Sequence, residues 1–210
     1  VVHILDRNGN VIKEFSIGVC PGGISSLLLA DLNKDGFLEI VMAVERSSSK
    51  QIYTVTKDGG PVKDWCINIG SVDSAHELNL SAGDVDNDGF LDIVSTYSKA
   101  EWVDISTRLR KTVSYINIWG RNPRETKFEK EGSSNLNISP ASLVDIDNDK
   151  DLEIFFTLHN EELYGCHHTG ELLLGYPKLC IEGASDFSPY TQPALDDIDN
   201  DKRIEVVSFK

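Results

Sequence analysis

The stretch DVDNDGFLDIV, from Asp84 to Val94, concentrates negative charge at one point of the chain. Its acidic residues occupy the first, third, fifth and ninth positions, and they are Asp84, Asp86, Asp88 and Asp92. Gly89, at the sixth position, permits the positive φ that folds a loop back on itself. An apolar, β-branched run follows at once. The stretch therefore predicts a tight acidic loop that leads into a β-strand.

The same pattern occurs four times along the 210 residues. The copies are DLNKDGFLEIVMAV from Asp31, DVDNDGFLDIVSTY from Asp84, DIDNDKDLEIFFTL from Asp145 and DIDNDKRIEVVSFK from Asp197. Their first residues lie 53, 61 and 52 residues apart. A repeat of this length indicates a propeller or a related array rather than a fold with one unrepeated core.

Each copy is surrounded by short β-type runs that end at Gly, Asn, Asp or Pro, and no window shows a sustained helical period. Four antiparallel strands per repeat predict an all-β fold, a β-propeller of four-stranded blades. The expected blades are 18–70, 71–130, 131–192 and a fourth that joins 1–17 with 193–210. They would form one domain over 1–210, either a closed ring of four blades or part of a larger propeller.

Bulk composition excludes several classes of protein. Hydrophobic residues make up 40% of the chain, enough for a packed core, and the net charge of −14 argues against nucleic acid as a partner. No run of 18 apolar residues predicts a transmembrane segment. The four cysteines lack zinc spacing, so they could pair in three ways or stay free, and free thiols are slightly favoured. The first residues already read as folded structure, which suggests a mature chain or a fragment.

The acidic loops have the chemistry of a calcium site. Ca²⁺ takes six to eight oxygen ligands, whereas Mg²⁺ requires a stricter octahedron, and zinc, iron or copper would call for His or Cys in the motif. Two carboxylates about 5 Å apart repel by about 3 kcal/mol at an effective dielectric of about 20. Without a cation such a loop should splay or take up protons. We therefore expect up to four Ca²⁺ ions with a structural role.

The expected ligands are side-chain oxygens at the first, third, fifth and ninth positions and the backbone carbonyl at the seventh. In chain order these residues are Asp31, Asn33, Asp35, Phe37, Glu39, Asp84, Asp86, Asp88, Phe90, Asp92, Asp145, Asp147, Asp149, Asp151, Glu153, Asp197, Asp199, Asp201, Arg203 and Glu205.

Two of the differences between the copies bear on how each loop would hold an ion. Asn33 removes one charge from the first loop, while Lys150 and Lys202 replace glycine at the sixth position of the third and fourth. A lysine there must adopt a left-handed conformation at a cost of about 1 kcal/mol. The first two sites are therefore expected to be the most regular.

An EF-hand begins with a similar sequence but needs a bidentate Glu at the twelfth position and flanking helices. The twelfth residues here are Met42, Ser95, Phe156 and Ser208, inside strand-like sequence. This rejects the EF-hand.

The segments ADLNKDGFLEIVMAV and GDVDNDGFLDIVSTY resemble the FG-GAP or VCBS-type repeats of integrin-α-like β-propellers. The resemblance implies that each acidic loop joins the first two strands of a blade and binds Ca²⁺. It also implies a secreted or cell-surface protein that serves in adhesion, in lectin-like binding or beside an enzyme domain. The Phe-Gly and Gly-Ala-Pro signatures are absent, so the likeness is to the looser, microbial-style variety.

The sequence contains no recognisable catalytic motif. Its five histidines show no metal spacing, and neither a G-x-S-x-G elbow nor a P-loop is present. We therefore expect a non-enzymatic, extracellular calcium-binding module that binds a protein or glycan ligand. The alternatives are the propeller domain of a carbohydrate-active enzyme, such as a polysaccharide lyase, and a purely structural spacer.

The longest repeat places aromatic residues beside cations, a combination that can hold a sugar or an acidic partner. The candidate ligand-binding residues are Tyr97, Trp102 and Arg108. The plainer reading is a long hairpin whose Trp packs on a neighbouring blade. Two glycosylation-type sequons begin at Asn79 and Asn137.

Overall fold

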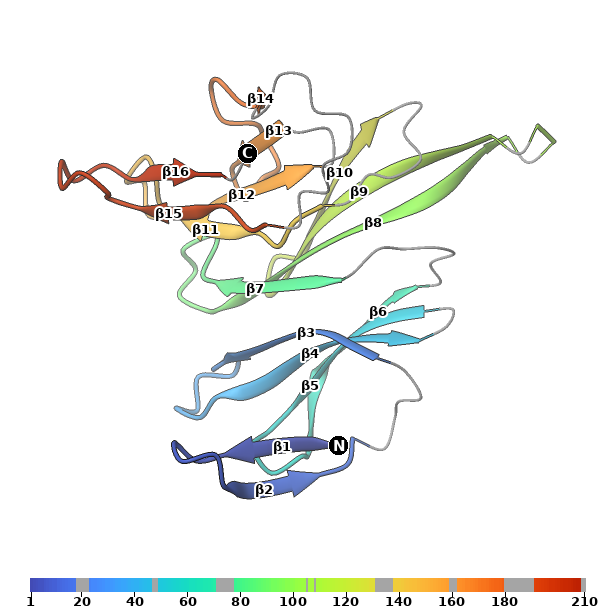
Figure 1. Ribbon diagram of the computed structural model, residues 1–210, viewed down its shortest axis with the longest axis vertical. Helices are drawn as coiled ribbons and strands as arrows, with labels where there is room; N and C mark the ends of the chain where they lie inside the picture. Colours follow the sequence, from blue (N-terminus) through green and yellow to red (C-terminus); the bar gives the residue numbers. More distant parts are fainter. Residues whose placement is uncertain are drawn as a thin grey trace. The chain divides into compact units, whose positions relative to one another are not determined.

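The computed structural model describes residues 1–17, 23–46, 49–70, 78–104, 106–107, 109–130, 138–158, 162–179 and 191–208. These residues form sixteen strands and no helix, and every strand pairing is antiparallel. The chain divides into two compact units, Val1–Ser71 and Val72–Lys210. The expectation of an all-β antiparallel fold is confirmed (Figure 1).

The first unit contains a four-stranded meander and a separate hairpin. The meander runs in the order β3 (Gly23–Ala30), β4 (Glu39–Arg46), β5 (Ser49–Val55) and β6 (Pro61–Gly70). The hairpin consists of β1 (Val2–Leu5) and β2 (Val11–Phe15). The two sheets share a hydrophobic core, because Val2, Ile4 and Phe15 of the hairpin pack against Ile40, Met42 and Val44 of β4.

The second unit contains two further meanders and a hairpin. The first meander consists of β7 (Asn79–Gly83), β8 (Asp92–Asp104), β9 (Leu109–Trp119) and β10 (Arg124–Lys130). The second consists of β11 (Ser142–Val144), β12 (Glu153–Leu158), β13 (Glu162–Cys166) and β14 (Lys178–Leu179). The hairpin pairs β15 (Ala194–Asp196) with β16 (Glu205–Val207).

The two meanders of the second unit pack face to face. Val94, Ile116 and Ile118 from β8 and β9 share a buried cluster with Ile154, Phe156 and Leu158 from β12. Phe156 stacks on Tyr164 with ring centroids 5.3 Å apart, and Phe128 of β10 packs on Phe156 at 5.1 Å. Burial of this apolar surface is the main force that holds the two sheets together.

The same polar contact joins successive sheets of this unit. The Ser81 hydroxyl donates to the Ala141 carbonyl at 2.6 Å, and the Ser142 hydroxyl donates to the Pro193 carbonyl. Each serine lies three residues before an acidic loop, and each carbonyl lies four residues before the next loop. The same serine-to-carbonyl hydrogen bond therefore links the β7–β10 sheet to the β11–β14 sheet, and the β11–β14 sheet to the β15–β16 hairpin.

The strands of the three meanders fall within the expected blades 18–70, 71–130 and 131–192. The chain's two end segments form the hairpins β1–β2 and β15–β16, each a two-stranded sheet.

Cys66 and Cys166 are free thiols, whereas Cys20 and Cys180 lie outside the described residues. Across the part of the chain that is described, there is no helix long and apolar enough to cross a membrane.

Candidate metal centres

Each acidic loop connects the first and second strands of its sheet. The loops lie between β3 and β4, β7 and β8, β11 and β12, and β15 and β16. The ninth loop position is the first residue of the second strand in every case, and these residues are Glu39, Asp92, Glu153 and Glu205. The expected order of acidic loop followed by strand is confirmed, and strands rather than helices flank the loops.

The four loops share one hydrogen-bond pattern. The backbone N–H at the second position donates to the ninth carboxylate at 2.9, 3.1, 2.9 and 2.9 Å in chain order. The sixth N–H donates to the first carboxylate at 3.0, 2.9, 3.1 and 2.8 Å. The seventh N–H donates to the fifth carboxylate at 2.8, 2.8, 3.0 and 2.8 Å. Each loop therefore wraps its own backbone around its carboxylates.

The sixth loop position is left-handed in all four repeats. The φ angles are 85° at Gly36, 86° at Gly89, 82° at Lys150 and 70° at Lys202. The prediction that the two lysines must adopt this conformation is confirmed.

The fourth loop position also has a positive φ, which the sequence reasoning missed. Its residues are Lys34, Asn87, Asn148 and Asn200, with φ between 53° and 64°. The recurrent asparagine was the available signal, because Asn tolerates the left-handed region better than most residues.

Replacing Lys150 with glycine should stabilise the protein. The substitution relieves the left-handed strain of about 1–2 kcal/mol, partly offset by the greater chain entropy of glycine. We expect a gain of about 1 kcal/mol, or about 2–4 °C in melting temperature for a chain of this length. Thermal melting of Lys150→Gly in saturating calcium measures this, and Gly89→Lys should give the opposite shift. A lower melting temperature for Lys150→Gly would show that the lysine is not strained.

The fold gathers carboxylates within reach of one ion. Among the described residues of the second unit, three sets of acidic side chains each place one oxygen per residue within 4.8 Å of the others. The sets are Asp84, Asp86 and Asp92; Asp145, Asp147 and Asp149; and Asp197, Asp199 and Glu205.

Several of these oxygens are buried without a donor. Asp84 Oδ1, Asp86 Oδ1 and Asp145 Oδ1 have no hydrogen-bond partner among the described residues. A buried, unsatisfied acceptor costs about 1–3 kcal/mol, and more when it is charged. A cation in the loop would satisfy these oxygens, so the residues present fit a metal ion.

The carboxyl groups at the ninth loop position have raised pKa values at Asp92, Glu39 and Glu153. Burial raises the pKa of Asp92 to about 6, and repulsion from Asp86, Asp88 and Asp84 adds to the shift. Burial also raises the pKa of Glu39 and of Glu153, again with neighbouring acids contributing. A proton or a cation is therefore favoured at this corner of the loop.

Asn33 gives the first loop a side-chain hydrogen-bond donor at its third position, where the other three loops have an aspartate. Its amide Nδ2 donates to Asp35 and to Glu39, at 3.2 Å in both cases. Its Oδ1 accepts the Asp35 N–H at 2.8 Å. The amide therefore offsets part of the repulsion between the carboxylates of this loop.

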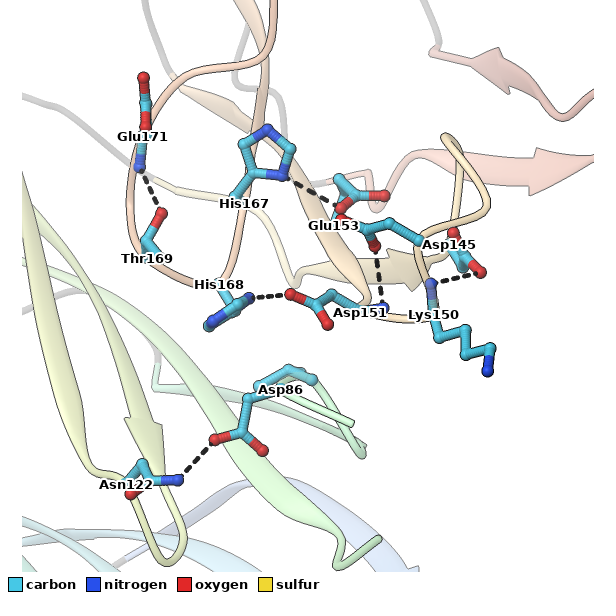
Figure 2. Close-up of polar contacts among 12 residues, drawn as sticks. Asp86, Asn122, Asp145, Lys150, Asp151, Glu153, His167, His168, Thr169 and Glu171 are labelled. Carbon is cyan, nitrogen blue, oxygen red and sulfur yellow. Dashed lines mark hydrogen bonds and ion pairs between the residues drawn. The ribbon is translucent and has the colours of Figure 1, made fainter. Parts of the chain in front are cut away.

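The turn between the third and fourth strands lies beside the loop in the two meanders of the second unit. In the second repeat, the side-chain amide of Asn122 donates to Asp86 at 2.8 Å. Gly120 packs so closely against Asp92 that a Cβ at position 120 would lie 1.7 Å from Asp92 Oδ1. In the third repeat, His167 Nδ1 lies 3.3 Å from Glu153 Oε1, and His168 Nδ1 lies 3.0 Å from Asp151 Oδ2 (Figure 2). These neighbours lie outside the loop motif, and sequence reasoning missed them.

The three candidate ligand-binding residues have different settings. Tyr97 is only 2% exposed and stacks on Tyr115 with ring centroids 5.0 Å apart. Trp102 is 45% exposed and belongs to β8. Strands β8 and β9 form a long hairpin (Figure 1). Arg108 lies outside the described residues. The structure thus leaves Trp102 as the candidate with an exposed ring.

The two sequons also differ in setting. The side-chain amide of Asn79 donates to the Ile138 carbonyl at 3.4 Å, whereas Asn137 lies outside the described residues.

Antiparallel sheets with an acidic loop at each first hairpin define the class: an all-β repeat protein with clustered carboxylates in its loops. Residues 31–95 match the family model described as an FG-GAP-like repeat. The match runs from the first acidic loop through the second and into β8, so the FG-GAP-type repeat found in the sequence is confirmed there. Neither a curated protein nor a solved structure matched the chain.

Proposed function

We propose that this chain is a calcium-stabilised β-propeller module that binds a protein or glycan ligand outside the cell. The calcium assignment rests on buried carboxylate oxygens of Asp84, Asp86 and Asp145 that have no donor within the described part of the chain. Hard oxygen donors around a tight loop are the ligands that Ca²⁺ prefers. The ion would fix the first hairpin of each blade and so present the surrounding loops.

The propeller arrangement is supported by the second unit. Its two meanders pack face to face, and one serine-to-carbonyl contact recurs between successive sheets. First strands also lie next to one another, since β11 contacts both β7 and β15. Blades that repeat one relation about an axis generate this pattern. Either a ring of four blades or a larger ring satisfies it.

An extracellular role is supported by the FG-GAP-like repeat, because such repeats are typically extracellular. Calcium outside the cell is about millimolar, which suits loop sites of modest affinity. The exposed ring of Trp102 supports ligand contact on the β8–β9 hairpin.

The calcium assignment is tested by Asp84→Ala. This substitution removes a carboxylate with a buried, unsatisfied oxygen, so bound calcium should fall by one ion per chain. Equilibrium dialysis with metal analysis measures the stoichiometry. Asp58→Ala is the matched control, because Asp58 is an exposed acid that pairs with Lys13 and Lys57 outside the loops. Equal stoichiometry in the two variants would reject the assignment.

Asp92→Asn should change stability in opposite directions with and without calcium. The amide oxygen can still accept the Val85 N–H, while the buried negative charge disappears. In chelator we expect a higher melting temperature than wild type, since an uncompensated charge is removed. In saturating calcium we expect a lower one, since a charged ligand is lost. A shift of the same sign under both conditions would contradict a cation at this carboxylate.

A further inference from the structure

The third repeat places an imidazole where the other meanders have none. In each meander, the tenth loop residue pairs with the last residue of the third strand: Ile40 with Val55, Ile93 with Trp119, and Ile154 with Cys166. The residue after that partner lies at the loop's edge in the second and third repeats. It is Thr56 in the first repeat, Gly120 in the second and His167 in the third.

The imidazole is held against the loop by its backbone. The His167 N–H donates to the Glu171 carbonyl at 2.9 Å, and the Gly170 N–H donates to the His167 carbonyl at 2.8 Å. His167 Nδ1 then lies 3.3 Å from Glu153 Oε1, and the Glu153 side chain is 0% exposed (Figure 2). A ring nitrogen from one hairpin is thus fixed beside a buried carboxylate from another.

Three donor atoms converge at this point. A carboxylate oxygen of Asp147, one of Glu153 and a ring nitrogen of His167 all lie within 4.8 Å of one another. Zinc holds nitrogen and oxygen ligands at about 2.0–2.2 Å, so neighbouring ligands in a tetrahedron lie about 3.3–3.6 Å apart. The 3.3 Å between His167 Nδ1 and Glu153 Oε1 is a hydrogen-bonding distance that also falls within this range. Asp145 Oδ1, which is buried with no hydrogen-bond partner among the described residues, belongs to the same loop.

The donor types favour a different ion from the one assigned to the other loops. Calcium takes oxygen ligands, whereas an imidazole nitrogen favours zinc and other first-row transition metals. We propose that the third loop binds a divalent transition metal such as Zn²⁺, with Asp147, Glu153 and His167 as ligands. This deepens the proposed function and rests on the loops being cation sites; it makes the third site chemically distinct from the rest.

The test is zinc titration of the untagged chain by calorimetry in saturating calcium. We expect one Zn²⁺ to bind per chain despite the calcium. His167→Thr, which installs the residue of the first repeat, should weaken that binding at least tenfold. His168→Ala is the matched neighbour control and His3→Ala the distant one; both should bind zinc as wild type does. With Co²⁺ as the probe, the visible absorption of a nitrogen-ligated ion should appear in wild type and be lost in His167→Thr.

The outcomes separate this inference from the calcium assignment. Absence of zinc binding in calcium, or equal loss in His167→Thr and His168→Ala, overturns the transition-metal site. If calcium still binds in that case, the proposed function is retained. If one zinc ion binds through His167 and no calcium binds to the chain, the transition-metal site is supported and the calcium role is overturned. With both metals present, His167→Thr should bind one more Ca²⁺ than wild type, and an unchanged calcium count also opposes the inference.

Discussion

Removing calcium should lower the melting temperature of this protein by about 10–20 °C. Each site at a free ion concentration of 100 times its Kd contributes about 2.7 kcal/mol, so two such sites contribute about 5 kcal/mol. That is comparable with the lower end of the whole stability of a typical domain, about 5–15 kcal/mol. For a chain of this length, 1 kcal/mol corresponds to about 2–4 °C. Thermal melting with and without chelator measures the shift.

Two controls make the calcium result specific. Magnesium added back in place of calcium should restore less of the stability, because Mg²⁺ requires a near-ideal octahedron and gives up its waters reluctantly. A variant carrying Asp84→Asn and Asp197→Asn should respond less to chelator than wild type does. An unchanged melting temperature on chelation, together with no bound ion, would remove the basis of the proposed function.

Truncating Phe156 to alanine should destabilise the protein by about 3–5 kcal/mol. Phe156 is 0% exposed, stacks on Tyr164 and contacts Phe128 from the facing sheet. Its loss leaves a cavity between the two meanders of the second unit and removes aromatic contacts with both neighbours. Chemical denaturation in constant calcium measures the loss.

Leu174→Ala is the control for that experiment, because Leu174 is fully exposed and its truncation should stay within about 0.5 kcal/mol. If Phe156→Ala and Leu174→Ala destabilise equally, the two meanders do not share the core described.

The repeat unit was readable from the sequence because local chemistry dictates it. A left-handed sixth residue, acids at alternate positions and a β-branched run after them determine a loop and the strand that follows. The strain at Lys150 could be predicted for the same reason, since it depends on one residue's backbone. The meanders followed from the spacing of the copies and from the turns between runs.

The surroundings of the loops could not be read in this way. Gly120 and His167 lie 28 and 14 residues from the acids they approach, in turns whose sequences share no pattern with each other. Only the strand register brings them to the loop. The stacking of Tyr97 on Tyr115 was also hidden, because an aromatic residue on a polar hairpin reads equally well as exposed.

The serine-to-carbonyl contacts between neighbouring sheets have a consequence for partly loaded protein. Ser81, Ser142 and the carbonyls they reach lie upstream of the loops, so none of these atoms is needed to hold an ion. Emptying one loop would loosen one corner while the adjoining sheets kept their alignment. Such a molecule would respond to falling calcium in graded steps, one hairpin at a time, rather than by a single collapse.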